Sequence, residues 1–201
     1  DNLDLDVLDL HNSQLYSPVL NKNLVLNNSN CNRILMHSNT FVEKILSKNT
    51  YNNYTCRLTK CDVNKSIDKE VFIKFAPLFD PVKYSINKIK DLPDSMGECL
   101  PKFEPQEDKF DYVYDENNAA YVDGYFTYLS SILLNNHNFL NGINFYGSFL
   151  GEKGNFKYNV FDELDVVIDN DEFVANINKK FHMDDEFVEK LFSNKSGSIE
   201  S

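Results

Sequence analysis

The feature that most constrains the fold is a pair of β-branched and aromatic runs separated by a short polar segment. The first run is "YTCRLTKCDV" at residues 54–63, the second is "KEVFIKFAPL" at residues 69–78, and "NKSID" lies between them. Two such runs on either side of polar turn residues predict a β-hairpin. The pair therefore indicates a fold that contains an antiparallel sheet.

Lys74 is the residue of this hairpin that needs an explanation, because a lysine is rarely buried without an anionic partner. Side chains alternate between the two faces of a strand, so Lys74 shares a face with Phe72. The opposite face is expected to carry Val71, Ile73 and Phe75. Two interpretations remain open: the lysine extends its stem across apolar surface to water, or it meets an anion in a cleft.

Three further segments predict the elements around the hairpin. "TFVEKILSK" at residues 40–48 places Glu43 three residues after Thr40, a capping box that predicts a short helix. A helix packed on a sheet is expected over residues 117–135, where apolar side chains repeat at helical spacing. Its inner face is expected to carry Ala119, Val122, Phe126, Leu129 and Leu133. A second hairpin is expected where residues 145–149 and 156–160 alternate around the turn "GEKG".

The remaining segments predict an insertion and two short helices. Residues 80–116 contain four prolines and little periodicity, so a long insertion is expected, with one helical turn at "VKYSINKIK". "DNDEFVANINKKF" at residues 169–181 and "MDDEFVEKLFSNK" at residues 183–195 each predict a short capped helix. The expected class is α+β: an antiparallel sheet with a packed helix, an N-terminal arm and short C-terminal helices.

Composition sets limits on the class of protein. The chain has 201 residues, of which 42% are hydrophobic, enough for a sizeable core. A formal net charge of −11 argues against a nucleic-acid partner, which would need clustered Lys and Arg. No apolar run approaches the length of a membrane span, and the acidic N-terminus is unlike a signal peptide, so a soluble intracellular chain is expected. The cysteines lack metal-ligand spacing and are interpreted as thiols outside any disulfide: Cys31, Cys56, Cys61 and Cys99.

Residues 1–37 are expected to form an extended acidic arm, with a short strand at "NLVLN". Ordering a residue costs roughly 1–2 kcal/mol of backbone entropy, so the arm is expected to be ordered against a protein partner or another subunit. The expected division is the arm, a domain at residues 38–168, and short helices with a polar tail at residues 169–201. A start without Met and the polar tail are both compatible with a piece of a longer protein.

The order strand, strand, insertion, helix, strand, strand resembles the small lobe of a protein kinase, and "VFIK" resembles the kinase motif V-A-I-K. Three segments, "VFIKFAPLFDPVKY", "NNAAYVDGYFTYLSSILL" and "NFYGSFLG", are together similar to kinase-like proteins of nucleocytoplasmic large DNA viruses of the iridovirus and amoebal giant-virus type. The resemblance covers roughly residues 55–195.

This resemblance implies a set of site residues. Lys74 would be the phosphate-pairing lysine, and Asp123 would be the helix acid that forms an ion pair with it. Glu116 is the weaker candidate, because the helix dipole already explains an acid at the helix start. The segment "NFYGSFLGEKGNFKYNVFDEL" resembles the strand pair that enters the kinase hinge, and it contains Glu163. Lys74, Phe72 and Glu163 would contact a cofactor.

The sequence also departs from the kinase pattern. Gly97 is the first glycine, so no glycine-rich phosphate loop precedes Lys74, and Phe72 stands where kinases have a small alanine beneath adenine. The catalytic loop H-R-D and the metal-binding D-F-G are missing. No cofactor is therefore expected in this chain, and ATP with magnesium only if a large lobe follows downstream.

The resulting hypothesis is a viral kinase-like protein, either a non-catalytic interaction module or the N-terminal portion of a longer serine/threonine kinase. The alternative is a structural or assembly protein of a large DNA virus particle. Either implies a location in the host cytoplasm, at the virus factory, or in the virion. An acidic cluster lacks the ligand pattern of a calcium loop and is interpreted as helix caps and solvated surface: Asp162, Glu163, Asp165, Asp169, Asp171 and Glu172.

Overall fold

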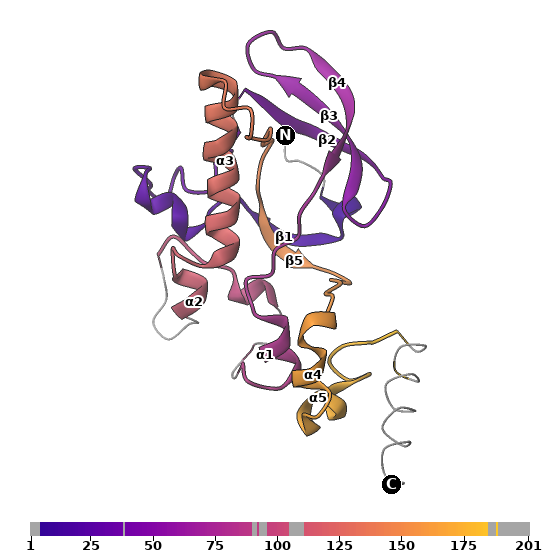
Figure 1. Cartoon of the computed structure of the whole chain (residues 1–201). Helices are drawn as coiled ribbons and strands as arrows, with labels where there is room; N and C mark the ends of the chain where they lie inside the picture. The colour runs from indigo at the N-terminus through magenta and orange to yellow at the C-terminus, as the bar shows by residue number, and fades with distance from the viewer. Residues whose placement is uncertain are drawn as a thin grey trace. The chain divides into compact units, whose positions relative to one another are not determined.

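The hairpin expected from residues 54–78 is confirmed and forms two strands of a three-stranded antiparallel sheet (Figure 1). β3 (Asn53–Lys60) pairs with β4 (Ser66–Phe72) on one side and with β2 (Thr40–Lys48) on the other. β3 is therefore the central strand and β4 an edge strand. Antiparallel sheets and helices occur together, as expected for the α+β class. The computed structural model describes residues 5–37, 39–89, 92, 96–104, 111–184 and 188.

The segment at residues 40–48 is strand β2, and the helix expected there is wrong. The Glu43 carboxylate accepts hydrogen bonds from the hydroxyls of Thr59 and Ser66, on the two strands that follow. Ile45 is buried in the core. The Thr-x-x-Glu spacing suits a helix locally, but the acceptor pairs with hydroxyls 16 and 23 residues away. Those distant partners favour the strand.

The N-terminal residues pack into the chain's own core, so the extended arm is wrong for residues 5–22. Leu8 is buried in the 3₁₀ helix η1 (Asp6–Leu8), and a second 3₁₀ helix, η2 (Pro18–Lys22), buries Val19 and Leu20. All of residues 23–27 are described, and they form no strand. The first core cluster joins the N-terminal leucines to the sheet: Leu5, Leu8, Ile45, Tyr54, Cys56, Leu58 and Val71. The leucines thus leave water without a partner chain.

A second, two-stranded sheet joins the beginning of the chain to its later part. β1 (Leu10–Gln14) pairs antiparallel with β5 (Leu150–Lys153). The second hairpin expected from residues 145–160 is wrong, because the segment "GEKG" lies largely in β5 and does not form a turn between two strands. A Cβ at Gly151 would lie 2.8 Å from Cγ of Leu10 and 2.9 Å from the His11 carbonyl oxygen, so only glycine lets the strands approach this closely.

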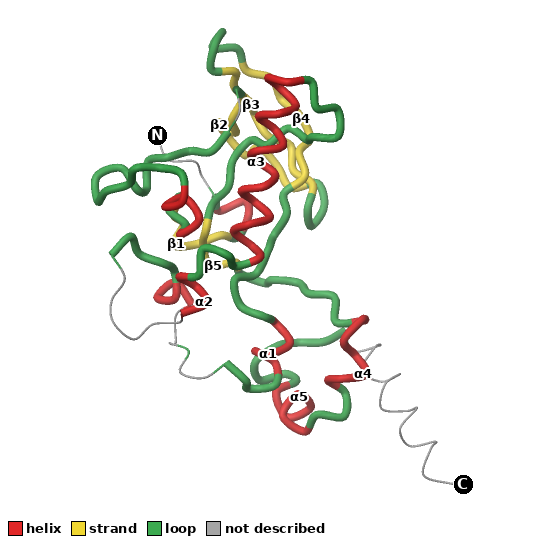
Figure 2. Tube along the Cα trace, turned by 60° about the vertical axis from the view of Figure 1, so that its left-hand side comes forward, coloured by secondary structure: helices red, strands yellow, loops and turns green. Residues whose placement is uncertain are grey.

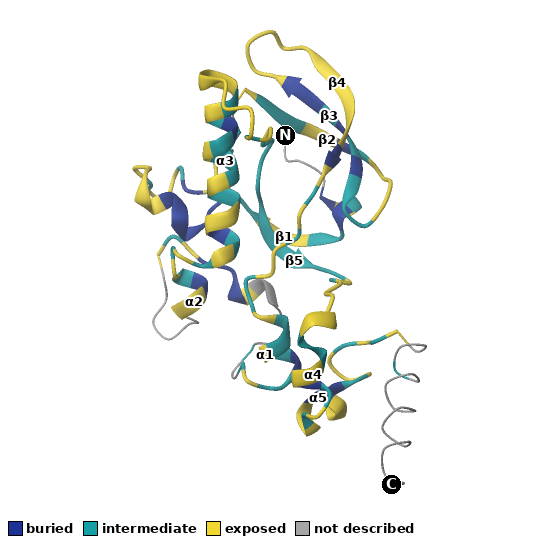
Figure 3. Cartoon of the chain, in the orientation of Figure 1, coloured by how far each residue is buried: buried dark blue, intermediate teal, exposed yellow. Residues whose placement is uncertain are grey.

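The helix expected over residues 117–135 is confirmed as α3 (Ala119–His137). The Asn118 side chain accepts from the Ala120 amide at its start, and Asn138 ends it in the left-handed conformation. Its expected inner face is wrong, since the buried residues are Tyr121 and Ser131. Figure 3 shows exposed stretches along α3. The exposed apolar residues of the helix lie on its other side: Val122, Phe126, Leu129 and Leu133. The side of α3 that faces the core carries tyrosines. Tyr121 is buried there, and its hydroxyl donates to the Val113 carbonyl.

The described residues of the insertion include three short helical segments. One of them, α1 (Pro81–Ser85), begins at Asp80, whose carboxylate accepts from the amides of Val82 and Lys83. The others are the 3₁₀ helix η3 (Met96–Cys99) and α2 (Asp111–Tyr114). A helical turn at the start of "VKYSINKIK" is thus confirmed.

Two compact units divide the chain. One comprises Asp1–Leu78 with Leu92–Phe156, the other Phe79–Asp91 with Lys157–Ser201, so both cut across the three segments expected from the sequence. The second unit contains α1, the 3₁₀ helix η4 (Phe161–Glu163), α4 (Leu164–Val167) and α5 (Asp171–Asn176) (Figure 2). A capped helix within residues 169–181 is confirmed as α5, with Asn170 as the cap. The last expected helix lies mostly outside the described residues.

A helix that spans a membrane needs about 20 predominantly apolar residues. In the described part of the chain, none of the helices combines the length and the apolar character needed to cross a bilayer.

Candidate functional site

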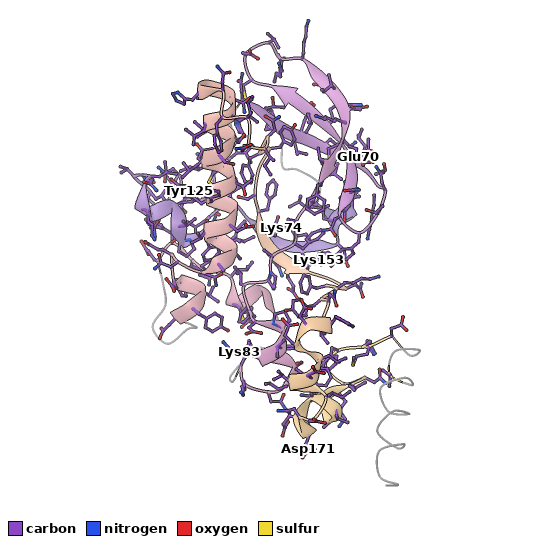
Figure 4. The ribbon with its side chains drawn as sticks, in the orientation of Figure 1. Glu70, Lys74, Lys83, Tyr125, Lys153 and Asp171 are labelled. Carbon is purple, nitrogen blue, oxygen red and sulfur yellow. The ribbon has the colours of Figure 1, made fainter. Side chains whose placement is uncertain are left out.

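Lys74 and Asp123 form the expected ion pair. The Lys74 Nζ lies 2.8 Å from Oδ2 of Asp123. Asp123 is the fifth residue of α3, and Lys74 lies two residues beyond the end of β4. The sequence predicts Lys74 within the second strand of the hairpin, but that strand, β4, is an edge strand and ends at Phe72. The pair joins the chain that leaves the sheet to α3. Figure 4 labels Lys74 on this stretch of chain.

The pair is open to solvent. The Lys74 side chain is 62% exposed and that of Asp123 is 48% exposed. Exposed ion pairs contribute roughly 0–1 kcal/mol to stability, because water screens both charges. The pair can therefore orient α3 relative to the hairpin, but its geometry is not that of a closed, water-excluding cleft.

The chain around Lys74 has the alternation expected of a strand. Val71 is buried, and Ile73 and Phe75 pack against the same cluster. Phe72 points the other way and is 69% exposed. Two hydrogen bonds continue past β4: the Asn52 carbonyl accepts from the Ile73 amide, and the Asn52 side chain donates to the Ile73 carbonyl. The Phe72 ring and the Lys74 ammonium, two residues apart in sequence, are both exposed.

The other two predicted acids lie elsewhere. Glu116 is 3.8 Å from the ammonium of Lys22, so its ion pair is not with Lys74. Glu163 belongs to the second unit, on η4, and accepts a hydrogen bond from the Tyr158 hydroxyl at 3.1 Å. Desolvation, together with this bond, raises the pKa of Tyr158. The three predicted cofactor contacts are therefore not in one unit.

Lys153 is a paired, largely buried lysine that sequence reasoning missed. Its side chain is only 12% exposed, and its Nζ lies 3.5 Å from Oδ2 of Asp9. The ammonium also donates to the Gly154 carbonyl and lies 5.4 Å from the centroid of the Phe75 ring. Hydrogen bonds from Asn155 and His11, with the charge of Lys153, lower the pKa of Asp9. Lys153 and Asp9 come together because β1 pairs with β5, and no local sequence pattern predicts that pairing.

Polar side chains tie the three strands of the larger sheet together. Arg57 donates through Nε and Nη2 to the two carboxylate oxygens of Asp68, at 2.9 and 3.1 Å. These bonds lower the pKa of Asp68 and raise that of Arg57. Hydrogen bonds from Thr59 and Ser66 likewise lower the pKa of Glu43. Every one of these groups has a partner within the sheet, so the cluster is a cross-strand ladder and not a ligand site.

The cysteines and the clustered acids are side chains of the types that bind metal ions. None of the four cysteines, all of which are described, forms a disulfide, and Cys61 is the exposed one. Burial raises the pKa of the Cys56 thiol to about 11. Asp171 and Glu172 lie in the first turn of α5, where acids favour the helix dipole. Among the described residues, no group of three His, Cys, Asp or Glu side chains is placed to share a metal ion.

Comparisons of the chain with protein-family models, with curated proteins and with solved structures gave no match.

Proposed function

We propose that the chain is a kinase-like small-lobe module, of the type found in large DNA viruses, that acts through protein contacts and not by phosphoryl transfer. The observation that carries the proposal is the Lys74–Asp123 pair at 2.8 Å. In kinase small lobes, the lysine that positions phosphates lies on a strand and pairs with a helix acid. Lys74 has the same kind of partner, although it lies two residues beyond β4. This supports the kinase-like interpretation of the hairpin and α3.

The surroundings of the pair favour a non-catalytic role. A phosphate-positioning lysine acts in a water-excluded site, where electrostatic interactions are strong. Here both partners are largely exposed, and Phe72 lies on the lysine side of the chain. Ion pairs of this kind also occur without catalysis. The pair then serves to hold α3 in place, and α3 offers its outward side to other molecules.

Calorimetry with ATP and magnesium tests the non-catalytic part of the proposal. The isolated chain is expected to give no binding with a dissociation constant tighter than about 10 μM, or about −7 kcal/mol. Lys74→Met, which keeps the apolar stem and removes the charge, is expected to give the same trace as the unchanged protein. Binding tighter than this limit that Lys74→Met abolishes would contradict the proposal and restore Lys74 as a nucleotide ligand.

A further inference from the structure

α3 carries an apolar stripe on its outward side that the described residues leave exposed. The stripe consists of Val122, Phe126, Leu129 and Leu133, and Phe126 is 70% exposed. Large apolar side chains gathered on one exposed helix face mark an interaction site more often than scattered ones do. This stripe is the side of α3 that the proposed function offers to other molecules. The molecule that binds there is inferred from the spacing and charge of the stripe.

The spacing of the stripe indicates what that occupant is. Its residues follow one another in steps of four, three and four, the a/d spacing of a coiled-coil seam. The stripe is also symmetric, since Val122 and Leu133 are equally far from the point between Thr127 and Tyr128, and so are Phe126 and Leu129. Two copies of α3 packed antiparallel therefore place Val122 against Leu133 of the second copy. The same two-fold axis places Phe126 against Leu129.

We propose that α3 pairs antiparallel with α3 of a second copy of this chain through this stripe. The proposal rests on the proposed interaction function and names its partner.

Charge permits this pairing. The chain has a net charge of −11, yet α3 contains no Lys or Arg, and its single carboxylate, Asp123, is already paired with Lys74. α3 therefore brings no unpaired carboxylate to the seam. Because repulsion between the rest of the two chains is screened by salt, dimerisation is expected to strengthen as ionic strength rises.

The exposed area limits the size of the interface. A phenyl side chain contributes roughly 150–250 Å² when it is fully buried, and the aliphatic members contribute less. The paired stripes and their neighbours then bury on the order of 1,000 Å² in total, the low end for a specific interface. A transient dimer with a dissociation constant of about 10–100 μM is expected.

Sedimentation equilibrium of the whole chain tests the dimer. The unchanged protein is expected to dimerise in this range, and Phe126→Glu is expected to weaken dimerisation at least about tenfold. Phe161→Glu is the matched control, because Phe161 is also 70% exposed but lies in the second unit. A protein that remains monomeric at millimolar concentration, or a dimer that Phe126→Glu leaves unchanged, would overturn the proposal.

Disulfide trapping tests the antiparallel register. In a Cys61→Ser background, which removes the exposed native thiol, a mixture of Val122→Cys and Leu133→Cys chains is expected to form a mixed disulfide. Val122→Cys alone is not expected to do so, because two copies of this residue would lie about 16 Å apart along the helix axis. A faster disulfide in Val122→Cys alone would contradict the antiparallel arrangement. Neither result depends on ATP, so loss of the dimer and gain of nucleotide binding overturn different claims.

Discussion

Two glycines near α3 differ in what surrounds the position of a missing Cβ. Nothing lies within 4 Å of a Cβ built on Gly124, whereas a Cβ on Gly142 would lie 2.5 Å from the Ser130 carbonyl oxygen. Gly124→Ala is therefore expected to stabilise the fold by about 0.5–1 kcal/mol, since alanine loses less entropy in a helix. Gly142→Ala is expected to destabilise it by more than that. Urea unfolding measured below the dimer concentration compares the two variants, and destabilisation by Gly124→Ala would contradict the open site.

Single residues also show the limits of prediction from sequence. The Lys74–Asp123 pair could be predicted from the resemblance to a kinase small lobe. In that arrangement a strand lysine pairs with an acid on the helix, and Asp123 is the acid well inside the helix. The Lys153–Asp9 pair could not, because its two residues come together only when β1 pairs with β5. Lysine and aspartate in a polar turn are locally indistinguishable from ordinary surface residues.

The sequence predicts the type of an element where apolar residues repeat regularly over many residues. It does not predict which face of that element is buried. The helical spacing of residues 117–135 predicted α3, but the tyrosines on its other side reach the core while the aliphatic stripe faces outward. A capping box predicted a helix at residues 40–48, yet β2 forms because Glu43 finds hydroxyls on β3 and β4. In both cases contacts with residues distant in sequence decide the outcome, and a local sequence pattern carries no information about those residues.

The N-terminal element tests how much of the fold depends on it. Leu8 is buried against the larger sheet, so Leu8→Ala is expected to lower the free energy of unfolding by about 2–5 kcal/mol through lost apolar contact and the cavity left behind. Val25→Ala, at an exposed residue nearby, is expected to change it by less than about 0.5 kcal/mol. Thermal or urea unfolding of dilute protein measures both. Equal stability of Leu8→Ala and the unchanged chain would mean that this segment is not docked in the isolated molecule.

At the scale of the whole molecule, acid is expected to weaken the fold. The pKa values of Asp9, Glu43 and Asp68 are lowered in the folded chain, chiefly by hydrogen bonds from Asn155, Thr59 and Arg57 respectively. A carboxyl group with a lowered pKa contributes stability that is present above its unfolded pKa, 3.8 for Asp and 4.5 for Glu, and is lost as pH falls through the folded value. The free energy of unfolding is therefore expected to fall below about pH 4.5.

Urea midpoints at pH 5 and pH 3 measure this decline. The expected decline begins at about pH 4.5, below the isoelectric point of 4.8, where loss of mutual repulsion between carboxylates no longer opposes it. Asp68→Asn removes one lowered carboxyl group and is expected to show a shallower decline. Constant or rising stability between the two pH values would show that these hydrogen bonds do not hold in solution.

The pairing of β1 with β5 has a consequence for the order in which the chain folds as it is synthesised. The Asn12 side chain bonds to Glu152 across 140 residues, whereas β2, β3 and β4 follow one another directly. At about 5–20 residues per second, a ribosome needs roughly 7–30 s to deliver the second strand after the first. The larger sheet can form within that interval, and β1 waits with its edges open. Its middle residues, His11, Asn12 and Ser13, are exposed and polar, which makes the waiting strand a poor template for aggregation on the nascent chain.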